Sequence, residues 1–263
     1  MRTWLCVFLF TGSIGLSFAA DTVEPLPQAH AHNDYEHERP LLDALDNGFC
    51  SVEADVWLVD GELLVAHDRD KVKKGRTLQS LYLDPLNERV TKNNGRVYRD
   101  GPQVTLLIDF KSPANPTYQA LKRVLKSYEN MLTRFENGVI HNGAIVVIIS
   151  GNRPFDQMRG ESFRFAGIDG RLSDLKNLPP KDFMPLISDN WKNHFKWRGD
   201  GAIADNELKK LRETIKQVQA EGRRIRFWGS PDVPESWKIQ RELGADLINT
   251  DNLNGLSKYL STE

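Results

Sequence analysis

The sequence predicts an α/β fold, a single (β/α)8 TIM barrel with a small β-hairpin insertion after the second strand. Short apolar segments of strand length recur along the chain, and segments with helical apolar spacing lie between them. The chain has 263 residues, close to the roughly 250 that one such barrel uses. Neither a repeat of fixed period nor a low-complexity linker divides it. We therefore expect one barrel domain rather than two smaller ones.

Eight apolar segments give the expected strands. Along the chain they are Leu26–Ala31, Ser51–Leu58, Val104–Phe110, Ala144–Ser150, Phe163–Gly167, Pro185–Ser188, Ile225–Trp228 and Asp246–Asn249. The clearest helices are expected at Tyr118–Phe135 and Asn206–Ala220, where apolar residues recur every three or four positions. The start of the fifth strand stays open, because residues 160–180 are rich in glycine and polar residues. After the second strand, Asp60-Gly61 lies between alternating apolar segments, which predicts a hairpin turn.

The first twenty residues have the composition of a secretory signal peptide. Arg2 precedes an apolar run, and Ser17-Phe18-Ala19 has the small residues of a cleavage site. We therefore expect residues 1–20 to be removed and residues 21–263 to form an exported domain, periplasmic or secreted. An uncleaved N-terminal anchor is the alternative. Removal of Cys6 would leave Cys50 alone, so no internal disulfide is expected.

The composition argues against two classes of protein. Hydrophobic residues make up 40% of the chain, too many for a disordered protein. The 35 basic and 36 acidic residues give a net charge of −1, so no general electrostatic attraction to nucleic acid is expected. We therefore expect no nucleic-acid partner. In barrels of this kind, sites for small molecules lie at the carboxyl ends of the strands.

Three carboxylates lie near the ends of neighbouring strands. Glu53 and Asp55 are two residues apart on the second strand, so both side chains point to the same face. Asp109 lies at the end of the third strand. Three carboxylates in a low-dielectric barrel mouth would repel one another, and a divalent cation that takes oxygen ligands, Mg²⁺ or Ca²⁺, would remove that repulsion. The alternative is a buried ion pair, for example of Glu53 or Asp109 with Lys111.

Three of the six histidines lie at the same end of the predicted barrel. His67 follows the predicted hairpin, which would deliver it to the carboxylates for a catalytic role. His30 and His32 are one strand period apart, so both face the same way, and either could be catalytic. They also leave an alternative open, because His30-x-His32 could bind zinc in an amidohydrolase-like enzyme. His141 and His194 are poorly placed to complete such a zinc site.

The order and spacing of these residues resemble the phosphatidylinositol phospholipase C-like phosphodiesterase superfamily, which includes the glycerophosphodiester phosphodiesterases. The sequence resembles in particular the branch of altered-inheritance-of-mitochondria proteins, over residues 28–111. The motifs that carry the resemblance are His32-Asn33-Asp34-Tyr35, Ser51-Val52-Glu53-Ala54-Asp55-Val56, Leu63-Leu64-Val65 leading into His67-Asp68, and Asp109-x-Lys111.

The resemblance implies a metal-dependent phosphoric diester hydrolase of lipid metabolism, similar to phospholipase C or glycerophosphodiesterase. It implies that the Mg²⁺ or Ca²⁺ is held by Glu53, Asp55 and Asp109. It also implies that His32 and His67 act as general acid and base. A non-catalytic binding barrel is a further alternative, which predicts an intact fold without hydrolysis.

The resemblance also bears on the substrate side of the site. Lys111 would contact the phosphate, Asn33 stands where relatives carry an arginine, and Trp228 would line the pocket. His30, the alternative to His32 as the catalytic residue, and Asp251 are further candidate residues of the site whose roles stay open. The expected substrate is a small phosphodiester or a phospholipid headgroup, with or without peripheral contact to a membrane. The choice between hydrolysis and internal cyclisation and the oligomeric state stay open.

Overall fold

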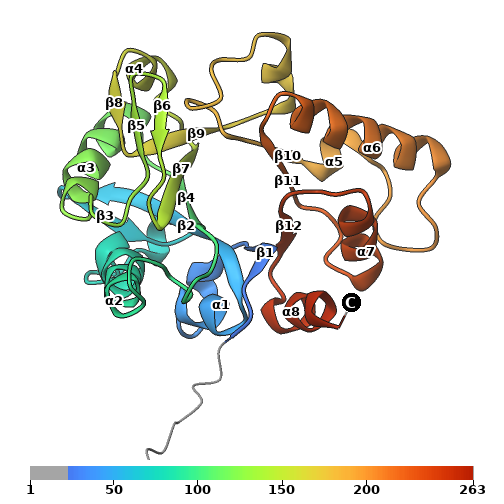
Figure 1. The fold of residues 1–263 in the computed structure, drawn as a ribbon, viewed down its shortest axis with the longest axis horizontal. Helices are drawn as coiled ribbons and strands as arrows, with labels where there is room; N and C mark the ends of the chain where they lie inside the picture. Colours follow the sequence, from blue (N-terminus) through green and yellow to red (C-terminus); the bar gives the residue numbers. More distant parts are fainter. Residues whose placement is uncertain (1–22, 263) are drawn as a thin grey trace, which may run out of the picture.

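Eight apolar segments pair side by side into a parallel barrel, which confirms the predicted fold class (Figure 1). The computed structural model describes residues 23–262; the predicted signal peptide, residues 1–20, lies outside them. The barrel strands are β1 (Leu26–Ala31), β2 (Phe49–Val59), β4 (Val104–Phe110), β7 (Ile145–Gly151), β9 (Ala166–Gly170), β10 (Leu186–Asn190), β11 (Arg224–Trp228) and β12 (Ile248–Thr250).

The strand order around the barrel is β11-β10-β9-β7-β4-β2-β1-β12. Strand β1 lies between β2 and β12, so the first and last strands pair directly. The ring closes between β11 and β12 through a parallel bridge that joins Arg226 to Leu247. In the register of the middle strands, Asp55 lies beside Asp109, and Asp109 lies beside Ser150. Side chains at the carboxyl ends of β2, β4 and β7 are therefore neighbours.

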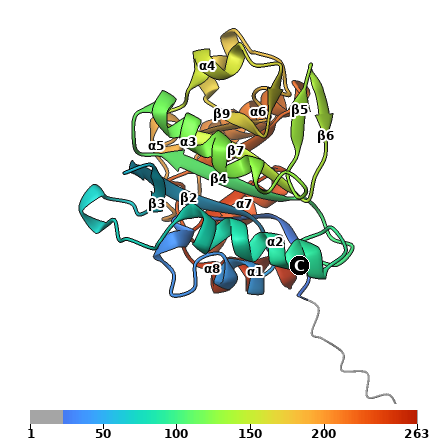
Figure 2. The same ribbon diagram turned by 90° about the vertical axis from the view of Figure 1, so that its left-hand side faces the viewer.

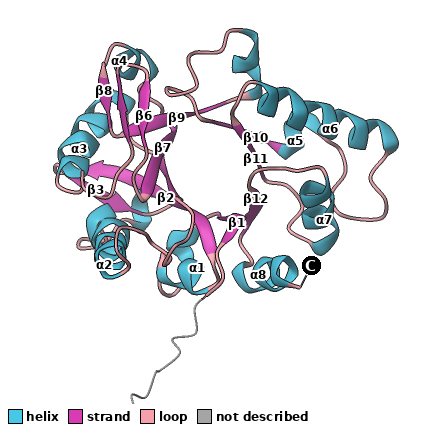
Figure 3. Cartoon of the chain, viewed as in Figure 1, coloured by secondary structure: helices cyan, strands magenta, loops and turns pink. Residues whose placement is uncertain are grey.

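Helices surround the ring of strands (Figure 3). They are α1 (Leu42–Asp46), α2 (Asp84–Lys92), α3 (Ala114–Lys126), α4 (Phe155–Arg159), α5 (Trp191–His194), α6 (Asp205–Ala220), α7 (Pro234–Glu242) and α8 (Leu253–Ser261). Shorter turns are η1 (Asp34–Glu36), η2 (Arg69–Lys71), η3 (Gln79–Leu83) and η4 (Leu172–Lys176). The turn η4 takes the place of a helix between β9 and β10. In α6, Leu211, Ile215 and Val218 form the buried face, as their spacing predicts.

The predicted hairpin after the second strand is confirmed. Strand β3 (Glu62–Val65) pairs antiparallel with the end of β2. Asp60 and Gly61 both have left-handed backbone angles, with φ of 49° and 87°, as a two-residue turn of this kind requires. Figure 2 shows this hairpin at one end of the barrel and the β5–β6 hairpin near the opposite end.

Two expectations about the middle of the chain are wrong. The helix expected to reach Phe135 ends at Lys126, because the chain turns there and forms a small antiparallel sheet of β5 (Arg134–Glu136), β6 (Val139–His141) and β8 (Phe163–Arg164). The fifth barrel strand begins at Ala166 rather than Phe163, because residues 163–164 pair with β5 and not with β7.

The barrel interior is polar at the carboxyl ends of the strands, its upper end, and apolar below them, at its lower end. A buried cluster of Leu107, Phe135, Val146, Ile148, Leu186 and Leu247 fills the lower part. A larger core lies between the strands and the surrounding helices, and the unpaired thiol of Cys50 is buried there. Within the barrel, polar groups are concentrated at the carboxyl ends of the strands.

Among residues 23–262, no helix is long and apolar enough to cross a membrane.

Candidate functional site

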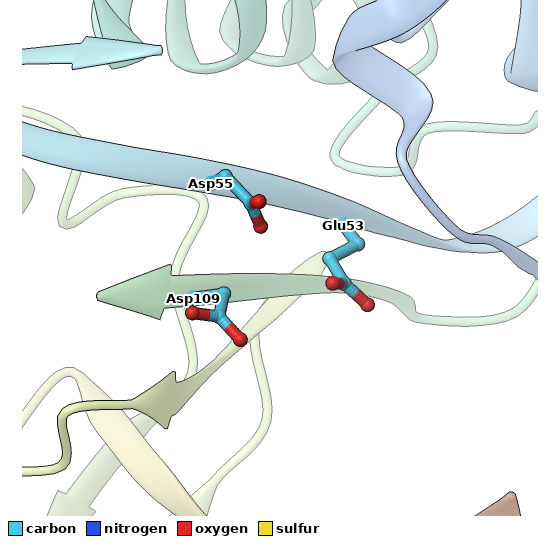
Figure 4. A group of neighbouring side chains, drawn as sticks. All are labelled: Glu53, Asp55 and Asp109. Carbon is cyan, nitrogen blue, oxygen red and sulfur yellow. The ribbon is translucent and has the colours of Figure 1, made fainter. Parts of the chain in front are cut away.

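The three predicted carboxylates converge at the carboxyl ends of β2 and β4 (Figure 4). Glu53 and Asp55 project from β2, and Asp109 projects from the neighbouring β4 to the same side of the sheet. One carboxylate oxygen from each residue lies within 4.8 Å of the other two. Glu53 and Asp55 are buried, and Asp109 is partly exposed. The sequence-based prediction that these three side chains converge is confirmed.

Two cations neutralise part of this negative charge. Lys111 Nζ lies 3.0 Å from Asp55 Oδ2 and 3.1 Å from Asp109 Oδ1. Arg226 crosses from β11, and its Nη1 donates to Glu53 Oε2 at 2.6 Å. The ion pair of Lys111 that the sequence offered as an alternative is therefore present, together with a second pair that the sequence analysis missed.

The carboxylates retain a capacity to bind a divalent cation. The Oδ1 atom of Asp55 is buried without a hydrogen-bond partner among the described residues. Burial and the charge of Glu53 raise the pKa of Asp55 to about 6, and burial raises the pKa of Asp109 as well. For Glu53, burial would raise the pKa, but the charge of Arg226 and the hydrogen bond with His30 together outweigh it and hold the pKa well below the ordinary value. Lys111 thus leaves part of the repulsion unrelieved, and the donor set of three carboxylates fits Mg²⁺ or Ca²⁺.

His30 is buried behind the carboxylates. Its Nε2 lies at Arg226 Nη1 and its Nδ1 lies 2.7 Å from Ser51 Oγ. Burial and the charge of Arg226 lower the pKa of His30 to about 3, so the ring is neutral near pH 7. Nε2 also lies 3.2 Å from Glu53 Oε2. Since the contact with Arg226 is the shorter one and guanidinium only donates, it makes Nε2 the acceptor and leaves Nδ1–H to donate to Ser51. Both ring nitrogens are engaged, which leaves His30 no free nitrogen for zinc.

His141 and His194 do not complete a zinc site either. His141 lies in the small antiparallel sheet, where its Nε2 is 3.9 Å from Glu136. His194 lies in α5, with its Nε2 3.3 Å from Asp189. Neither residue lines the cavity that holds the carboxylates. The arrangement that the amidohydrolase alternative needs is therefore not formed by these side chains.

His67 is delivered to Asp55 by the segment that follows the hairpin. Its Nδ1 lies 3.0 Å from Asp55 Oδ2, and its side chain is 49% exposed. The hydroxyl of Tyr35 lies 2.7 Å from the same carboxylate oxygen, 3.1 Å from His67 Nδ1 and 2.6 Å from Asn33 Oδ1. Tyr35 thus links three predicted site residues, a role that the sequence analysis did not assign.

His32 is held by Asp251, from the loop after β12. His32 Nδ1 lies 2.8 Å from Asp251 Oδ1, and Asn33 Nδ2 donates to the same oxygen at 3.2 Å. Burial is the largest influence on His32 and would lower its pKa, but the hydrogen bond to Asp251 and the charge of Glu53 together outweigh it, and the pKa lies above the ordinary value. Both polar ends of the Asn33 side chain are occupied by protein groups.

A cavity of about 310 Å³ joins these groups at the barrel mouth. The predicted site residues that line it are His32, Asn33, Glu53, Asp55, His67, Asp109, Lys111 and Trp228. Ser150, Arg171 and Arg226, which the sequence analysis did not single out, line it too. Arg226 and Trp228 are two residues apart on one strand, so their side chains point to the same face. That spacing could have revealed Arg226, because Trp228 was already predicted to line the pocket. Arg171 follows the strand whose start was misplaced.

Comparison with known proteins identifies the relatives of this chain. The model of the AIM6-like phosphodiesterase domain matches residues 17–166. The altered inheritance of mitochondria protein 6 homolog of Arthroderma benhamiae is 27% identical, over 90% of this chain and 84% of the relative. Altered inheritance of mitochondria protein 6 of Lachancea thermotolerans is 31% identical, over 92% of this chain and 67% of the relative.

Solved structures show a similar fold. A glycerophosphodiester phosphodiesterase from Parabacteroides distasonis has a TM-score of 0.52 at 17% identity and covers 91% of this chain and 98% of its own. A putative glycerophosphoryl diester phosphodiesterase from Silicibacter pomeroyi has a TM-score of 0.53 at 11% identity and covers 92% and 96%. At such low identity this likeness concerns the fold alone. Since the family model matches more than half of the sequence, the chain belongs to the AIM6-like phosphodiesterase domain family.

Proposed function

We propose that this chain hydrolyses a phosphodiester with the help of one divalent cation, Mg²⁺ or Ca²⁺, held by Glu53, Asp55 and Asp109. The observation that carries the proposal is that one cavity is lined by these carboxylates and by two histidines, His32 and His67. The buried Asp55 Oδ1, which has no partner among the described residues, supports the cation. The family description names phosphodiesterase chemistry.

A count of charges supports the same proposal. Glu53, Asp55 and Asp109 carry three negative charges, and Lys111 and Arg226 carry two positive ones. The cluster alone therefore has a net charge of about −1, which would repel a phosphodiester. One divalent cation changes this to about +1, which a singly charged diester neutralises. A doubly charged monoester would leave an excess of one negative charge, so the count favours diesters over monoesters.

The side chains divide the chemistry between them. A bound divalent cation would polarise a non-bridging phosphate oxygen and stabilise the charge that develops there. Lys111, once its carboxylate partners hold the cation, would turn its ammonium group to the phosphate. His67 and His32 each have Nδ1 beside a carboxylate oxygen, which leaves Nε2 to face the substrate.

We assign the role of general acid to His32 and that of general base to His67. The hydrogen bond to Asp251 and the charge of Glu53 together raise the pKa of His32 above its ordinary value, against the effect of burial. The raised pKa favours the protonated ring that a general acid needs. Each of these proton transfers contributes roughly 10²–10⁴-fold in rate. Asn33, bonded to Asp251 and Tyr35, would hold His32 in position rather than bind the phosphate itself.

The substrate and the location of the enzyme are part of the proposal. A cavity of about 310 Å³, roughly the share of ten water molecules, accommodates a phosphate with a small substituent. We propose a small phosphodiester or the headgroup of a phospholipid, with Trp228 against the substituent, as the substrate. The signal-like residues 1–20 support export to the periplasm or the outside.

Hydrolysis of bis-p-nitrophenyl phosphate tests the proposal. EDTA should abolish the activity of the purified protein, and Mg²⁺ or Ca²⁺ should restore it. His32→Ala and His67→Ala should each lower kcat by at least about 100-fold with the fold retained. His141→Ala, in the small sheet away from the cavity, is the matched control and should leave kcat unchanged. Activity that is indifferent to chelation, or that needs zinc alone, would overturn the proposal, as would a folded protein that hydrolyses no phosphodiester.

A further inference from the structure

Arg171 lines the same cavity as the carboxylates but has no place in the proposed function. It follows β9, two strands along the barrel from Asp109, and its side chain is 24% exposed. The other two cations of the cavity are already committed to carboxylates inside it, Lys111 to Asp55 and Asp109, and Arg226 to Glu53. The partner of Arg171, Asp169, does not line the cavity.

The guanidinium of Arg171 is fixed on one side only. Its Nη1 donates to Asp169 Oδ2 at 2.8 Å and to the carbonyl of Gly170 at 2.9 Å. Its Nη2 makes one long bond, 3.3 Å, to Ser150 Oγ, and its Nε makes none among the described residues. The edge formed by Nε and Nη2 therefore keeps unused donors beside the cavity.

Asp169 is built to hold this arrangement. It is completely buried, and its Oδ2 accepts hydrogen bonds from Ser150 Oγ at 2.8 Å and Ser188 Oγ at 2.5 Å as well as from Arg171. A buried carboxylate that is fixed by two hydroxyl groups offers a rigid anchor. Since guanidinium is planar, anchoring Nη1 also fixes the direction in which the opposite edge of Arg171 points.

We propose that Arg171 binds the phosphate of the substrate through its Nε and Nη2 edge, and that Asp169 is its positioning residue. This inference rests on the proposed function and extends it. A guanidinium edge matches two acceptor atoms on phosphate, which an ammonium group such as that of Lys111 does not. Lys111 and Arg171 would then approach the phosphate from β4 and from the end of β9.

The neighbouring Arg153 provides a matched control. Its Nη1 donates to the carbonyl of Asp169 at 2.7 Å, and the Nη1 of Arg171 lies 3.4 Å from the same oxygen. Arg153 lines an adjoining groove rather than the carboxylate cavity. Replacing either arginine by glutamine removes one positive charge from the same region, but only Arg171→Gln removes a donor from the cavity.

Kinetics with bis-p-nitrophenyl phosphate and calorimetry with inorganic phosphate test the inference. Arg171→Gln should raise KM and the Kd of phosphate for the Mg²⁺-loaded protein by about 10- to 100-fold, the loss expected for hydrogen bonds between charged groups. Arg171→Lys should recover part of this loss. Arg153→Gln should change both values by less than about twofold. Unchanged KM and Kd in a folded Arg171→Gln protein would overturn the inference.

The role of Asp169 is tested by its dependence on Arg171. Asp169→Asn should raise KM in the wild-type background but add little in the Arg171→Gln background, because both changes remove the same interaction. Additive effects would make Asp169 a merely structural residue. If Asp169→Asn fails to fold, Ser188→Ala should reproduce a smaller KM increase. The phosphate titration needs no turnover, so it separates this inference from the proposed function: loss of phosphate binding in Arg171→Gln supports Arg171 even if no diester is hydrolysed.

Discussion

Gly151, at the end of β7, lies so close to Asp109 that no larger residue fits. Its φ is +66°, and a Cβ atom built on it would lie 2.2 Å from Asp109 Oδ1 and 2.6 Å from the carbonyl oxygen of Phe110. Ordinary contacts of a Cβ atom begin at 3.4 Å. In Gly151→Ala, the carboxylate of Asp109 would therefore have to retreat by roughly 1 Å, whereas functional groups must be held within about 0.5 Å.

We predict that Gly151→Ala weakens binding of Mg²⁺ or Ca²⁺ by about 10- to 100-fold, the range seen when the support of a metal ligand is removed. The substitution also forces alanine into a left-handed backbone conformation, which costs about 1–2 kcal/mol of stability. The two effects must be measured separately. Calorimetric titration of the metal-free protein gives the metal Kd, and urea unfolding gives the free energy of unfolding.

Gly201 separates the contact from the backbone strain. Its φ is +62°, almost that of Gly151, but a Cβ atom there would meet nothing within 4 Å. Gly201→Ala should therefore lose a similar 1–2 kcal/mol of stability and keep the metal Kd of the wild type. Equal metal affinities in the two alanine variants would refute the reasoning that Gly151 is needed for the position of Asp109.

Three further predictions concern the groups around the carboxylates. Asp251→Asn should lower the pKa of His32, which an NMR titration of the ring measures, and should move the alkaline limb of kcat/KM to lower pH; an unmoved limb would exclude His32 as the acid. Asp34 is buried, and burial raises its pKa from 3.8 to about 6. Its contribution to stability is therefore full below pH 3.8 and lost as the pH rises through 6. The change that Asp34→Asn causes in the free energy of unfolding should accordingly be more favourable at pH 8 than at pH 4, by roughly 1–3 kcal/mol. Urea unfolding at the two pH values measures this difference, and equal changes at both would contradict the prediction. Tyr35→Phe should lower kcat for bis-p-nitrophenyl phosphate by roughly tenfold, since its hydroxyl contacts Asp55 and His67; an unchanged kcat would make that contact dispensable.

The barrel could be predicted because its strands are buried on both sides. Such strands consist of short continuous apolar segments, and the helices between them keep a distinct apolar spacing. The predictions failed where this signal is mixed. Phe135 continues the apolar spacing of α3, yet it belongs to β5 and joins the cluster in the lower barrel interior. Phe163 belongs to a second sheet that ends two residues before β9 begins.

The candidate site could be predicted where strand alternation and chain order determine it. Glu53, Asp55 and Asp109 follow from period-two spacing on adjacent strands, and the Asp60-Gly61 turn directs the next segment back to the barrel mouth. Contacts between distant segments carry no such local signal. Arg226 meets Glu53 across the barrel, although the two residues are 173 positions apart along the chain. Only the closed ring brings these two side chains together.

Because β1 pairs with β12, the site combines residues that are synthesised early with residues that are synthesised last. All three carboxylates, His67 and Lys111 are complete once the ribosome has passed β4, and β2 and β4 pair directly. Arg226 and Asp251 emerge more than a hundred residues later, and His32 obtains its partner only when β12 docks on β1. A nascent or truncated chain can thus carry the charged half of the site well before it has the residues that neutralise Glu53 and orient His32.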